Sequence, residues 1–421
     1  MADDVNDADS LSPRGTTRCR GCVSTALVSV LDLGRQPLAN EMALTADSPD
    51  PSFPLHLRIC TSCGLGQVGE YVLPERIFSK DYPYISSVST SWVEHAGAYA
   101  SDMRESLSLS QDDLVVEVAS NDGYLLAQVK ELGIPVLGVE PAGNVAQLAR
   151  GRGVPTLSEF FGLDCARRII DEYGHPRLVV ANNVMAHVPD LHDFAAGLAA
   201  LCDDETIITV ENPSFLNLLR ETQFDTIYHE HFSYLTAHAV QRAVGPHGLR
   251  LVRVDALPTH GGSNRYWLAR TTSAHPVHPS VDETVGGELA EGLLDAETWA
   301  AFAQRSHLAL DGLRGWLDEQ QRQGRTVVGY GAAAKGNTLL NAAGGGPADL
   351  LVVVDGSSAK QGRFLPGSHV AVVAPSSLPA YQPDAVLVLP WNIASEVVPV
   401  VRDLVPDAEC WTAIPTMRRL T

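Results

Sequence analysis

The sequence predicts an α/β protein in which a small cysteine-rich module precedes two Rossmann-like domains. Two Cys-x-x-Cys pairs lie near the N-terminus, and two separate series of short apolar runs and helical patterns follow them. Strands that alternate with helices along a chain pair as parallel sheets with helices on both faces. The two series therefore predict two covered sheets, one from about residue 86 to 273 and one from about residue 326 onward.

The length and charge of the chain limit its class and its partners. Its 421 residues are enough for two large domains and a small third one. With 30 basic and 50 acidic residues the formal net charge is −20, which disfavours nucleic acids and anionic membrane surfaces as partners. No apolar run reaches the roughly 18–20 residues of a membrane span. The acidic residues 1–17 predict a disordered tail and no secretory signal, so we expect a cytoplasmic protein with reduced thiols.

Residues 18–82 are expected to form a small module wrapped around zinc. Cys19 and Cys22 make one Cys-x-x-Cys pair, and Cys60 and Cys63 make the other. A tight turn lets both thiolates of such a pair point at one ion, and two pairs complete the closed tetrahedral shell of a structural zinc site. Redox-active pairs and four free thiols are the competing interpretations. The presence of a second pair favours zinc over both.

Residues 83–273 are expected to form a domain that binds S-adenosylmethionine. The predicted strand 114–118 runs into a small turn, Ala-Ser-Asn-Asp-Gly-Tyr, that opens a helix and resembles the first motif of class I methyltransferases. The lack of G-x-G-x-x-G argues against NAD and FAD. A chance turn is the alternative, but an acidic residue also ends the predicted strand 136–139, where a carboxylate can accept ribose hydroxyls. The candidate cofactor-binding residues are Glu117, Ala119, Asn121, Asp122, Gly123, Tyr124, Glu140, Pro141, Asn182 and Asn183.

Tyr228, His229, Glu230 and His231 form the densest titratable cluster of the chain. They follow the predicted strand 206–210, near the carboxyl edge at which open α/β sheets bind ligands. His and Glu are the usual general acids and bases, and Tyr can donate to a developing oxyanion. An H-x-H metal site and a polar surface loop are the alternatives. No third metal ligand lies at a recognisable spacing, which favours acid–base chemistry.

Residues 274–421 are expected to form a second α/β domain. A long helix over 298–323 precedes predicted strands at 326–329, 350–354, 370–373 and 385–389. The small residues of 329–337 follow the first of these strands and, with a lysine among them, can form an anion site at a helix N-terminus. A plain tight turn explains them equally well. The candidate substrate-binding residues of this domain are Tyr330, Lys335, Asn337, Lys360, Arg363 and Asn392.

The order of the motifs resembles that of the sugar C-methyltransferases of antibiotic biosynthesis. The resemblance covers nearly the whole chain from Cys19 on. It rests on the two cysteine pairs followed by DYPYISSVS, VVEVASNDGYLL, NNVMAHVPD, YHEHFSYL, HGGSNRYW and GYGAAAKGNTLLN. It implies S-adenosylmethionine as the cofactor, a structural zinc, and a dTDP-linked 4-keto deoxysugar that is methylated at a carbon next to the ketone. It also implies that the C-terminal domain binds the sugar nucleotide.

The same resemblance implies roles for individual residues. His231 corresponds to the general base, and Tyr228 and Glu230 belong to the same motif. His187 follows the Asn-Asn strand end. Tyr82 and Tyr84 belong to the DYPY motif at the end of the zinc module and are further candidates for binding the substrate. A base must remove a proton next to the ketone while donors such as Tyr82, Tyr228 or His187 stabilise the enolate oxygen.

Several alternatives remain open at this point. The carbon could be C3 or C5, because both flank a C4 ketone. A methyltransferase that acts on oxygen or nitrogen would also use a general base, and a non-catalytic adaptor built on the zinc module is a third reading. We expect a monomer, because tandem domains can enclose a site within one chain.

Overall fold

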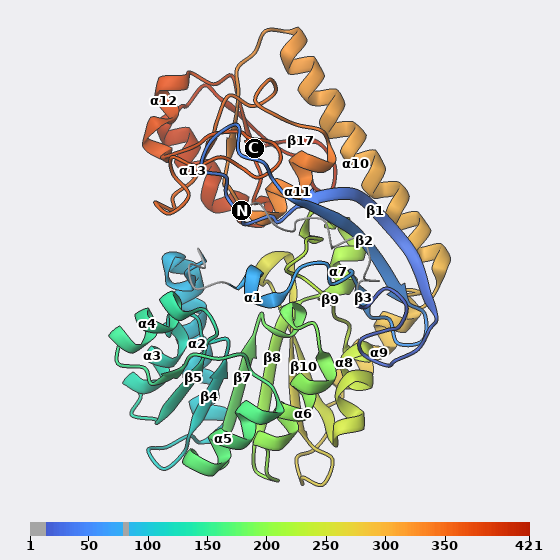
Figure 1. Ribbon diagram of the computed structural model, residues 1–421, viewed down its shortest axis with the longest axis vertical. Helices are drawn as coiled ribbons and strands as arrows, with labels where there is room; N and C mark the ends of the chain where they lie inside the picture. Colours follow the sequence, from blue (N-terminus) through green and yellow to red (C-terminus); the bar gives the residue numbers. More distant parts are fainter. Residues whose placement is uncertain (1–13, 79–83) are drawn as a thin grey trace, which may run out of the picture.

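The computed structural model describes residues 14–78 and 84–421, which form two α/β lobes bridged by a long β-hairpin (Figure 1). Three sheets organise these residues. We refer to residues 14–78 as the cysteine module, to 84–290 as the central domain and to 291–421 as the C-terminal domain. Tyr82, which the sequence singles out as a site residue, lies outside the described residues.

The central domain contains a seven-stranded sheet in the order β10-β11-β8-β7-β4-β5-β6. The four strands that the sequence predicts in this region are confirmed, and they pair in parallel. Two further strands, β10 and β11, add an antiparallel edge that the sequence analysis does not predict. The strands are β4 (Val115–Val118), β5 (Val136–Val139), β6 (Thr156–Leu157), β7 (Leu178–Asn182), β8 (Ile207–Pro213), β10 (Leu249–Leu257) and β11 (Ser263–Arg270).

Helices cover both faces of this sheet because its strands are apolar on both sides. Val115 packs into a core with α2 (Thr90–Leu107) and α3 (Tyr124–Glu131). Its neighbour Val116 faces the opposite core, with α5 (Leu163–Tyr173), α6 (Leu191–Leu201) and α8 (Ala237–Val244). Successive residues of a strand point to opposite faces, so the continuous apolar run buries both. Helix α4 (Gly143–Gly151) lies between β5 and β6 in the chain.

The C-terminal domain repeats this arrangement with a six-stranded sheet in the order β14-β13-β12-β15-β16-β17. All its pairs are parallel except that of β16 with β17. The strands are β12 (Val327–Tyr330), β13 (Val353–Val354), β14 (Val372–Val373), β15 (Ala385–Val388), β16 (Glu409–Thr412) and β17 (Arg418–Leu420). Its helices are α10 (Ala296–Arg322), α11 (Ala334–Ala342), α12 (Leu378–Tyr381) and α13 (Ala394–Leu404).

The boundary between these domains differs from the one predicted at residue 273. Helix α9 (Ser280–Ala290) packs against α8 and β10, which belong to the central domain. The buried carboxylate of Glu288 accepts the backbone N–H groups of Ala237 and His238 and so caps the first turn of α8. The chain thus passes to the C-terminal domain only after α9.

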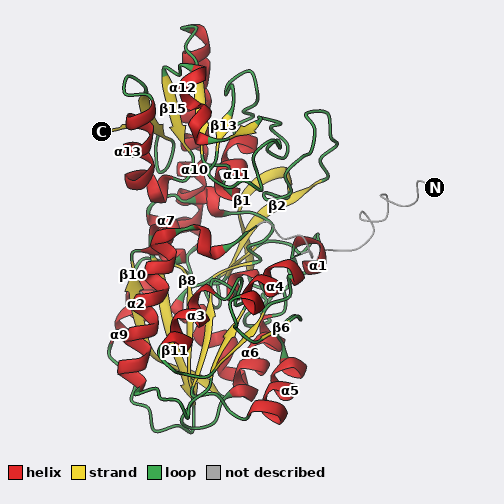
Figure 2. Cartoon of the chain, turned by 90° about the vertical axis from the view of Figure 1, so that its left-hand side faces the viewer, coloured by secondary structure: helices red, strands yellow, loops and turns green. Residues whose placement is uncertain are grey.

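The cysteine module does not fold as a separate unit, because its strands extend to both other domains. Its strands β1 (Leu27–Pro37) and β2 (Ser52–Cys60) form a long hairpin that runs beside α10 toward the C-terminal domain (Figures 1 and 2). Leu31 and Leu57 on this hairpin are fully buried in one core with Leu313 and Trp316 of α10. Because apolar strand faces need a partner to bury them, the hairpin connects the two lobes.

The rest of the module's sheet reaches into the central domain. The order β1-β2-β3-β9 joins β3 (Gly66–Gln67) to β9 (Ser233–Tyr234), a strand of the central domain. Residues 14–17, which the sequence assigns to a disordered tail, are part of the described structure, and Arg14 forms a β-bridge with Glu70. Helix α1 (Pro74–Ile77) closes the module. Among the described residues, no helix is long and apolar enough to cross a membrane.

Candidate functional site

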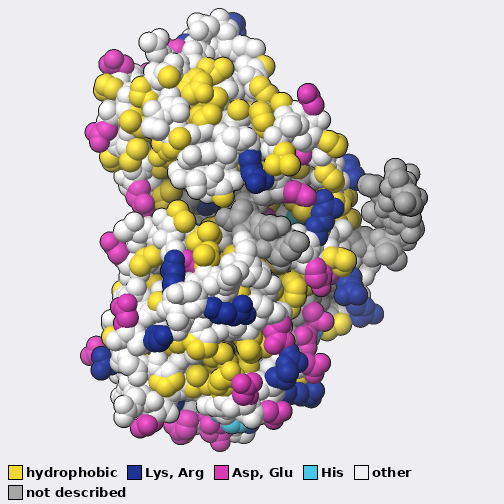
Figure 3. All heavy atoms as spheres, turned by 60° about the vertical axis from the view of Figure 1, so that its left-hand side comes forward, with side chains coloured by type: hydrophobic (Ala, Val, Ile, Leu, Met, Phe, Trp, Pro, Cys, Tyr) yellow, Lys and Arg dark blue, Asp and Glu magenta, His cyan; other side chains and the backbone are white. Residues whose placement is uncertain are grey.

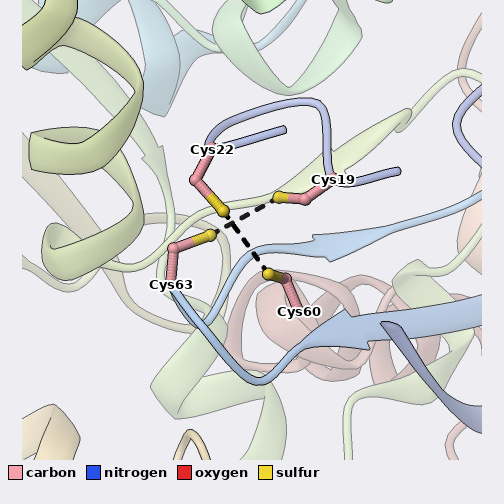
Figure 4. Close-up of side chains that lie close together, drawn as sticks. All are labelled: Cys19, Cys22, Cys60 and Cys63. Atoms are coloured by element: carbon pink, nitrogen blue, oxygen red, sulfur yellow. Dashed lines mark hydrogen bonds between the residues drawn. The ribbon is translucent and has the colours of Figure 1, made fainter. Parts of the chain in front are cut away.

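The four paired cysteines converge on one point, as the sequence predicts. Their Sγ atoms all lie within 4.8 Å of one another, with Cys19 and Cys63 3.5 Å apart and Cys22 and Cys60 3.6 Å apart (Figure 4). Thiolates around a tetrahedral zinc ion, each about 2.3 Å from the metal, are separated by about 3.8 Å. The donor set therefore fits zinc, and with four protein ligands it leaves no open position for a substrate.

The first cysteine knuckle also contacts the chain just after the reactive cluster. Arg20, between Cys19 and Gly21, donates from its guanidinium to the carbonyl of Phe232 at 2.7 Å. The next residues, Ser233 and Tyr234, pair as β9 with β3 of the module. We call residues 226–234 the histidine loop. Its C-terminal end is thus fixed by the cysteine module, although it belongs to the central domain.

A large cavity lies where the three parts of the chain meet. Its volume is about 610 Å³, within the range of small-molecule sites. Asn40 and Phe78 of the module, the strand ends of the central domain, and Lys335 and Asn392 of the C-terminal domain all line it. In Figure 3 the waist between the two lobes carries basic side chains, whereas many acidic side chains gather on the lower lobe.

The central-domain side of the cavity is shaped by an unusually twisted turn after β4. Ala119, Asn121 and Gly123 all have positive φ, at 56°, 49° and 75°. Asn121 fixes the turn to the following segment, since its side chain accepts the backbone N–H of Ser86 at 2.8 Å and donates to the carbonyl of Tyr84 at 3.2 Å. Backbone strain of this kind persists where a close approach to a ligand requires it.

Polar groups around this turn suit the adenosine and amino-acid parts of S-adenosylmethionine. The carboxylate of Glu140 accepts the backbone N–H groups of Asn121 and Ala142 at 3.0 and 2.8 Å, and it lines the cavity. Burial raises the pKa of this carboxyl above its usual range. The side-chain Oδ1 of Asn182 and Nδ2 of Asn212 are buried at the cavity without a partner among the described residues. Such orphaned groups are expected where a polar ligand completes the hydrogen bonding.

The predicted cofactor residues divide into two groups. Those that line the cavity are Ala119, Asn121, Tyr124, Glu140, Pro141, Asn182 and Asn183. Glu117, Asp122 and Gly123 instead lie beneath the turn. Asp122 forms an ion pair with Arg152 at 2.7 Å, and a Cβ on Gly123 would lie 3.1 Å from Ala149. Burial, with the nearby carboxylates, holds the pKa of Glu117 well above its usual value.

His231 lies at the centre of the cavity in a defined tautomer. Its Nδ1 is 3.0 Å from the carbonyl of Thr226, which can only accept, so the proton sits on Nδ1. The lone pair of Nε2 then accepts the hydroxyl of Tyr228 at 2.9 Å. Burial, followed by the electrostatic effects of the neighbouring His187 and Lys335, holds the pKa of His231 well below its ordinary value of 6.5. His231 is therefore a neutral imidazole with its basic nitrogen available at the cavity.

His187 offers an acceptor and not the donor that the sequence analysis considers. Its Nδ1 donates to the carbonyl of Glu230 at 2.8 Å, and burial lowers its pKa to about 4. The neutral ring consequently presents an unprotonated Nε2. Its ring centroid lies 4.7 Å from that of His231. Stabilisation of an anionic oxygen by His187 is incompatible with this tautomer.

Glu230 and His229 have different partners on either side of His231. The side chain of Asn40, from the cysteine module, donates to both carboxylate oxygens of Glu230 at 2.7 and 2.9 Å. Sequence reasoning missed Asn40, since no local pattern marks it. His229 turns toward β2, where its Nε2 lies 3.3 Å from the carbonyl of Pro54. It does not line the cavity, so it acts as a structural contact to the hairpin.

The C-terminal domain brings some of its predicted residues to the cavity and not others. Lys335, Lys360 and Asn392 line it, as does Tyr84 from the central domain, which had been predicted with them. Lys335 donates to Asn392 at 2.7 Å, and Lys360 donates to the carbonyl of Ala332 at 2.8 Å. Tyr330, Asn337 and Arg363 lie outside the lining. Asn337 is buried within α11 and Arg363 is exposed to solvent, because position near a strand end does not fix the direction of a side chain.

A buried polar network beside the cavity was also missed. Glu211, at the end of β8, is fully buried and contacts His95 at 3.1 Å and Arg265 at 3.1 Å. Burial alone would raise the pKa of Glu211, but these two partners outweigh it and lower the pKa. The network supports Trp92 and His260, whose rings are 4.8 Å apart and which both line the cavity. Only its carboxyl-edge location could have indicated this acid.

Comparison with protein families divides the chain in the same order as the fold. A "Putative zinc binding domain" matches residues 19–78, a "Methyltransferase domain" matches 92–254 and a "C-methyltransferase C-terminal domain" matches 258–415. The C-methyltransferase NovU of Streptomyces niveus is 34% identical over 387 residues, which are 91% of this chain and 92% of that protein.

Solved structures resemble part of the chain more remotely. Magnesium protoporphyrin IX methyltransferase from Synechocystis PCC 6803 is 16% identical with a TM-score of 0.33, covering 42% of this chain and 83% of its own. The PH0226 protein from Pyrococcus horikoshii OT3 is 10% identical with a TM-score of 0.35, covering 45% and 97%.

The cysteine geometry predicts one tightly held zinc per chain. Cys60→Ser should remove most of it, because the hard hydroxyl is a poor ligand for zinc compared with a thiolate. Cys165→Ser is the matched control, since Cys165 is also a buried free thiol but lies away from the cluster. Native mass spectrometry checks the zinc content of both. Full occupancy in Cys60→Ser, or equal loss in both variants, would contradict a four-cysteine site.

Proposed function

This chain belongs to the C-methyltransferase family, and we propose that it methylates a carbon next to the ketone of a dTDP-linked 4-keto-6-deoxysugar. It is an enzyme that uses S-adenosylmethionine, which supplies an electrophilic methyl group. The proposed carbon is C3 or C5 of the sugar. A role in deoxysugar and antibiotic biosynthesis is part of the same proposal.

The tautomer of His231 is the observation that carries this proposal. A hydrogen on a carbon next to a ketone is only weakly acidic, so the base that removes it must be unprotonated and correctly placed. The Nε2 of His231 meets both conditions at the cavity. In the structure the hydroxyl of Tyr228 donates to that lone pair. We expect the sugar to take its place, which leaves the phenol of Tyr228 free to donate to the sugar oxygen.

The charges around the cavity favour the enolate that deprotonation would create. Lys335 lines the same cavity as His231, and its positive charge lowers the pKa of that residue. A buried positive charge stabilises a developing anion far more than one in water does. Asn40 donates to both carboxylate oxygens of Glu230 and so fixes the orientation of this side chain at the cavity.

Lys335, Lys360 and Asn392 are proposed to bind the diphosphate and the nucleotide of the substrate. They line the same cavity from the C-terminal domain, opposite the strand ends of the central domain. Two lysines at this position offset the overall charge of −20 locally. We propose that a single chain forms the whole site, since residues of all three parts line one cavity. A cytoplasmic location is part of the same proposal.

Transfer of the methyl group to an oxygen or nitrogen atom is the alternative that the geometry of this site also allows. A general base would also activate a hydroxyl or an amine. The tautomer of His231 does not distinguish these acceptors, so the preference for carbon rests on the family to which the chain belongs. Proton exchange at the carbon distinguishes the two, because only carbon chemistry requires enolisation.

Deuterium exchange tests this proposal. The protein, without cofactor, should exchange the hydrogen next to the ketone of a dTDP-4-keto-6-deoxysugar with deuterated water, as measured by proton NMR. His231→Asn should slow this exchange by roughly 100- to 10,000-fold, the usual contribution of a general base. His187→Asn is the companion variant, since it tests the neighbouring imidazole. No exchange above the rate in buffer would reject carbon methylation of this substrate, and unchanged exchange in His231→Asn would reject His231 as the base.

The pH dependence follows from the environment of His231. His187, Lys335 and His260 surround it and, after burial, lower its pKa, so its basic form persists below pH 6.5. We expect kcat/KM to stay level as the pH falls through 6.5 and to drop only at lower pH. Lys335→Met removes a positive charge, raises the pKa of His231 and should move this acid limb to higher pH.

Lys130→Met provides the control for that shift, because Lys130 is exposed and its ammonium contacts the carbonyl of Gly153. An acid limb at or above pH 6.5 in the wild type, or the same shift in both lysine variants, would contradict the assignment of the limb to His231.

A further inference from the structure

Asp225 and Trp391 form a hydrogen bond between the central and C-terminal domains at the start of the histidine loop. The indole Nε1 of Trp391 donates to Oδ2 of Asp225 at 2.7 Å. Asp225 is fully buried, and its other oxygen, Oδ1, has no hydrogen-bond partner among the described residues. Hydrogen bonds to a charged group are among the stronger ones, and leaving a buried carboxylate unpaired is costly.

This bond is one peptide away from the group that sets the tautomer of His231. Asp225 and Thr226 both belong to the short helix η3 (Phe224–Thr226). The carbonyl of Thr226 accepts Nδ1–H of His231 at 3.0 Å. A displacement of Asp225 would therefore move the carbonyl that holds the proton on Nδ1 and keeps Nε2 basic.

The same tryptophan contacts the cation of the cavity. The ammonium of Lys335 lies 4.7 Å from the centre of the Trp391 ring, a cation–π distance, and it donates to the neighbouring Asn392. Asp225 is the charge that favours the protonated form of Lys335. Lys335 and Asn392 line the cavity, whereas Trp391 and Asp225 lie behind it.

The backbone packs closely around the indole. A Cβ on Gly261 would come within 2.5 Å of the Trp391 ring, so only glycine allows this contact. The carbonyl of Gly261 accepts the side chain of Gln223 at 3.0 Å, just before Asp225. The indole is consequently held between η5 (Thr259–Gly261) and η3, with little room for another orientation.

We propose that Asp225 and Trp391 are positioning residues through which the C-terminal domain orients His231. They do not touch the substrate. Trp391 holds Asp225, Asp225 fixes the turn that carries the Thr226 carbonyl, and that carbonyl keeps the proton of His231 on Nδ1. An anionic group bound at Lys335 would affect the contact of this ammonium with the Trp391 ring. Substrate binding at Lys335 is therefore coupled to the orientation of His231 through Trp391 and Asp225. The catalytic consequence rests on the proposed role of His231, whereas the effect on its tautomer does not.

Nitrogen-15 NMR of histidine-labelled full-length protein tests the proposal without substrate. The ring nitrogens of His231, assigned by their loss in His231→Asn, should report a neutral ring protonated on Nδ1. Trp391→Phe keeps a ring beneath Lys335 but removes the N–H donor, so the two tautomers of His231 should mix. Asp225→Ala removes the acceptor and should give the same spectrum, and the double variant should add little, because both changes break one bond.

Trp411→Phe is the matched control. Its indole, like that of Trp391, donates to a carboxylate. The acceptor is Glu409 at 3.2 Å, which lies in the same domain as Trp411 and away from the cavity. In methyl-transfer assays we expect Trp391→Phe to lower kcat by about 10- to 100-fold, the size of one charge-assisted hydrogen bond, with the affinity for S-adenosylmethionine unchanged. Trp411→Phe should leave both quantities within about twofold of the wild type.

The outcomes separate this inference from the proposed function. An unchanged His231 spectrum in both Trp391→Phe and Asp225→Ala overturns the positioning role, whatever the substrate. A fall in kcat matched by an equal loss of cofactor affinity also overturns it, since that pattern indicates general loosening of the fold. A tautomer shift in a protein that shows no deuterium exchange with any keto sugar supports the positioning role and rejects the proposed substrate.

Discussion

The pairing of β3 with β9 is the contact on which the geometry of the site depends. It places a strand of the cysteine module against Ser233 and Tyr234, directly after the reactive cluster. Phe232 lies between the reactive cluster and β9. Its carbonyl accepts hydrogen bonds from the backbone N–H of Val68 and from the guanidinium of Arg20. Arg20 stands inside the first cysteine knuckle, so the zinc site and the histidine loop are linked by adjacent residues. The metal does no chemistry there, yet it fixes the turn from which this end of the loop is held.

The other end of the histidine loop is fixed from the opposite lobe. Trp391 of the C-terminal domain contacts Asp225, and α11 packs on η3. His231 thus lies in a segment whose two ends are each held by a different part of the chain. The hairpin of β1 and β2 also packs against α10, and this shared core helps to keep the two lobes in one relative position. Burial of the imidazole among these parts is also what lowers its pKa.

The strands and the zinc site could be predicted from the sequence, but the contacts that connect the three parts of the chain could not. Runs of Val, Ile and Leu such as Val115–Val118 marked the buried strands, and the cysteine spacing marked the zinc site. Strands of two residues, such as β3 and β9, carry no periodic pattern, and their pairing joins segments more than 160 residues apart. Asn40 and Asp225 are single polar residues whose importance comes only from partners remote in sequence. For the same reason Asn337 was misplaced, since its neighbours in sequence say nothing of which face of α11 it occupies.

Hydrogen exchange measured by mass spectrometry, before and after zinc is removed by a chelator, tests the central claim that the cysteine module fixes the histidine loop. The account predicts that amides of residues 232–236 lose protection when the metal is removed, whereas those of β4 and β7 in the central sheet keep theirs. Retained protection at 232–236 in zinc-free protein would show that the loop holds its position without the module. Equal loss throughout the chain would show that zinc supports the whole fold and not this loop in particular.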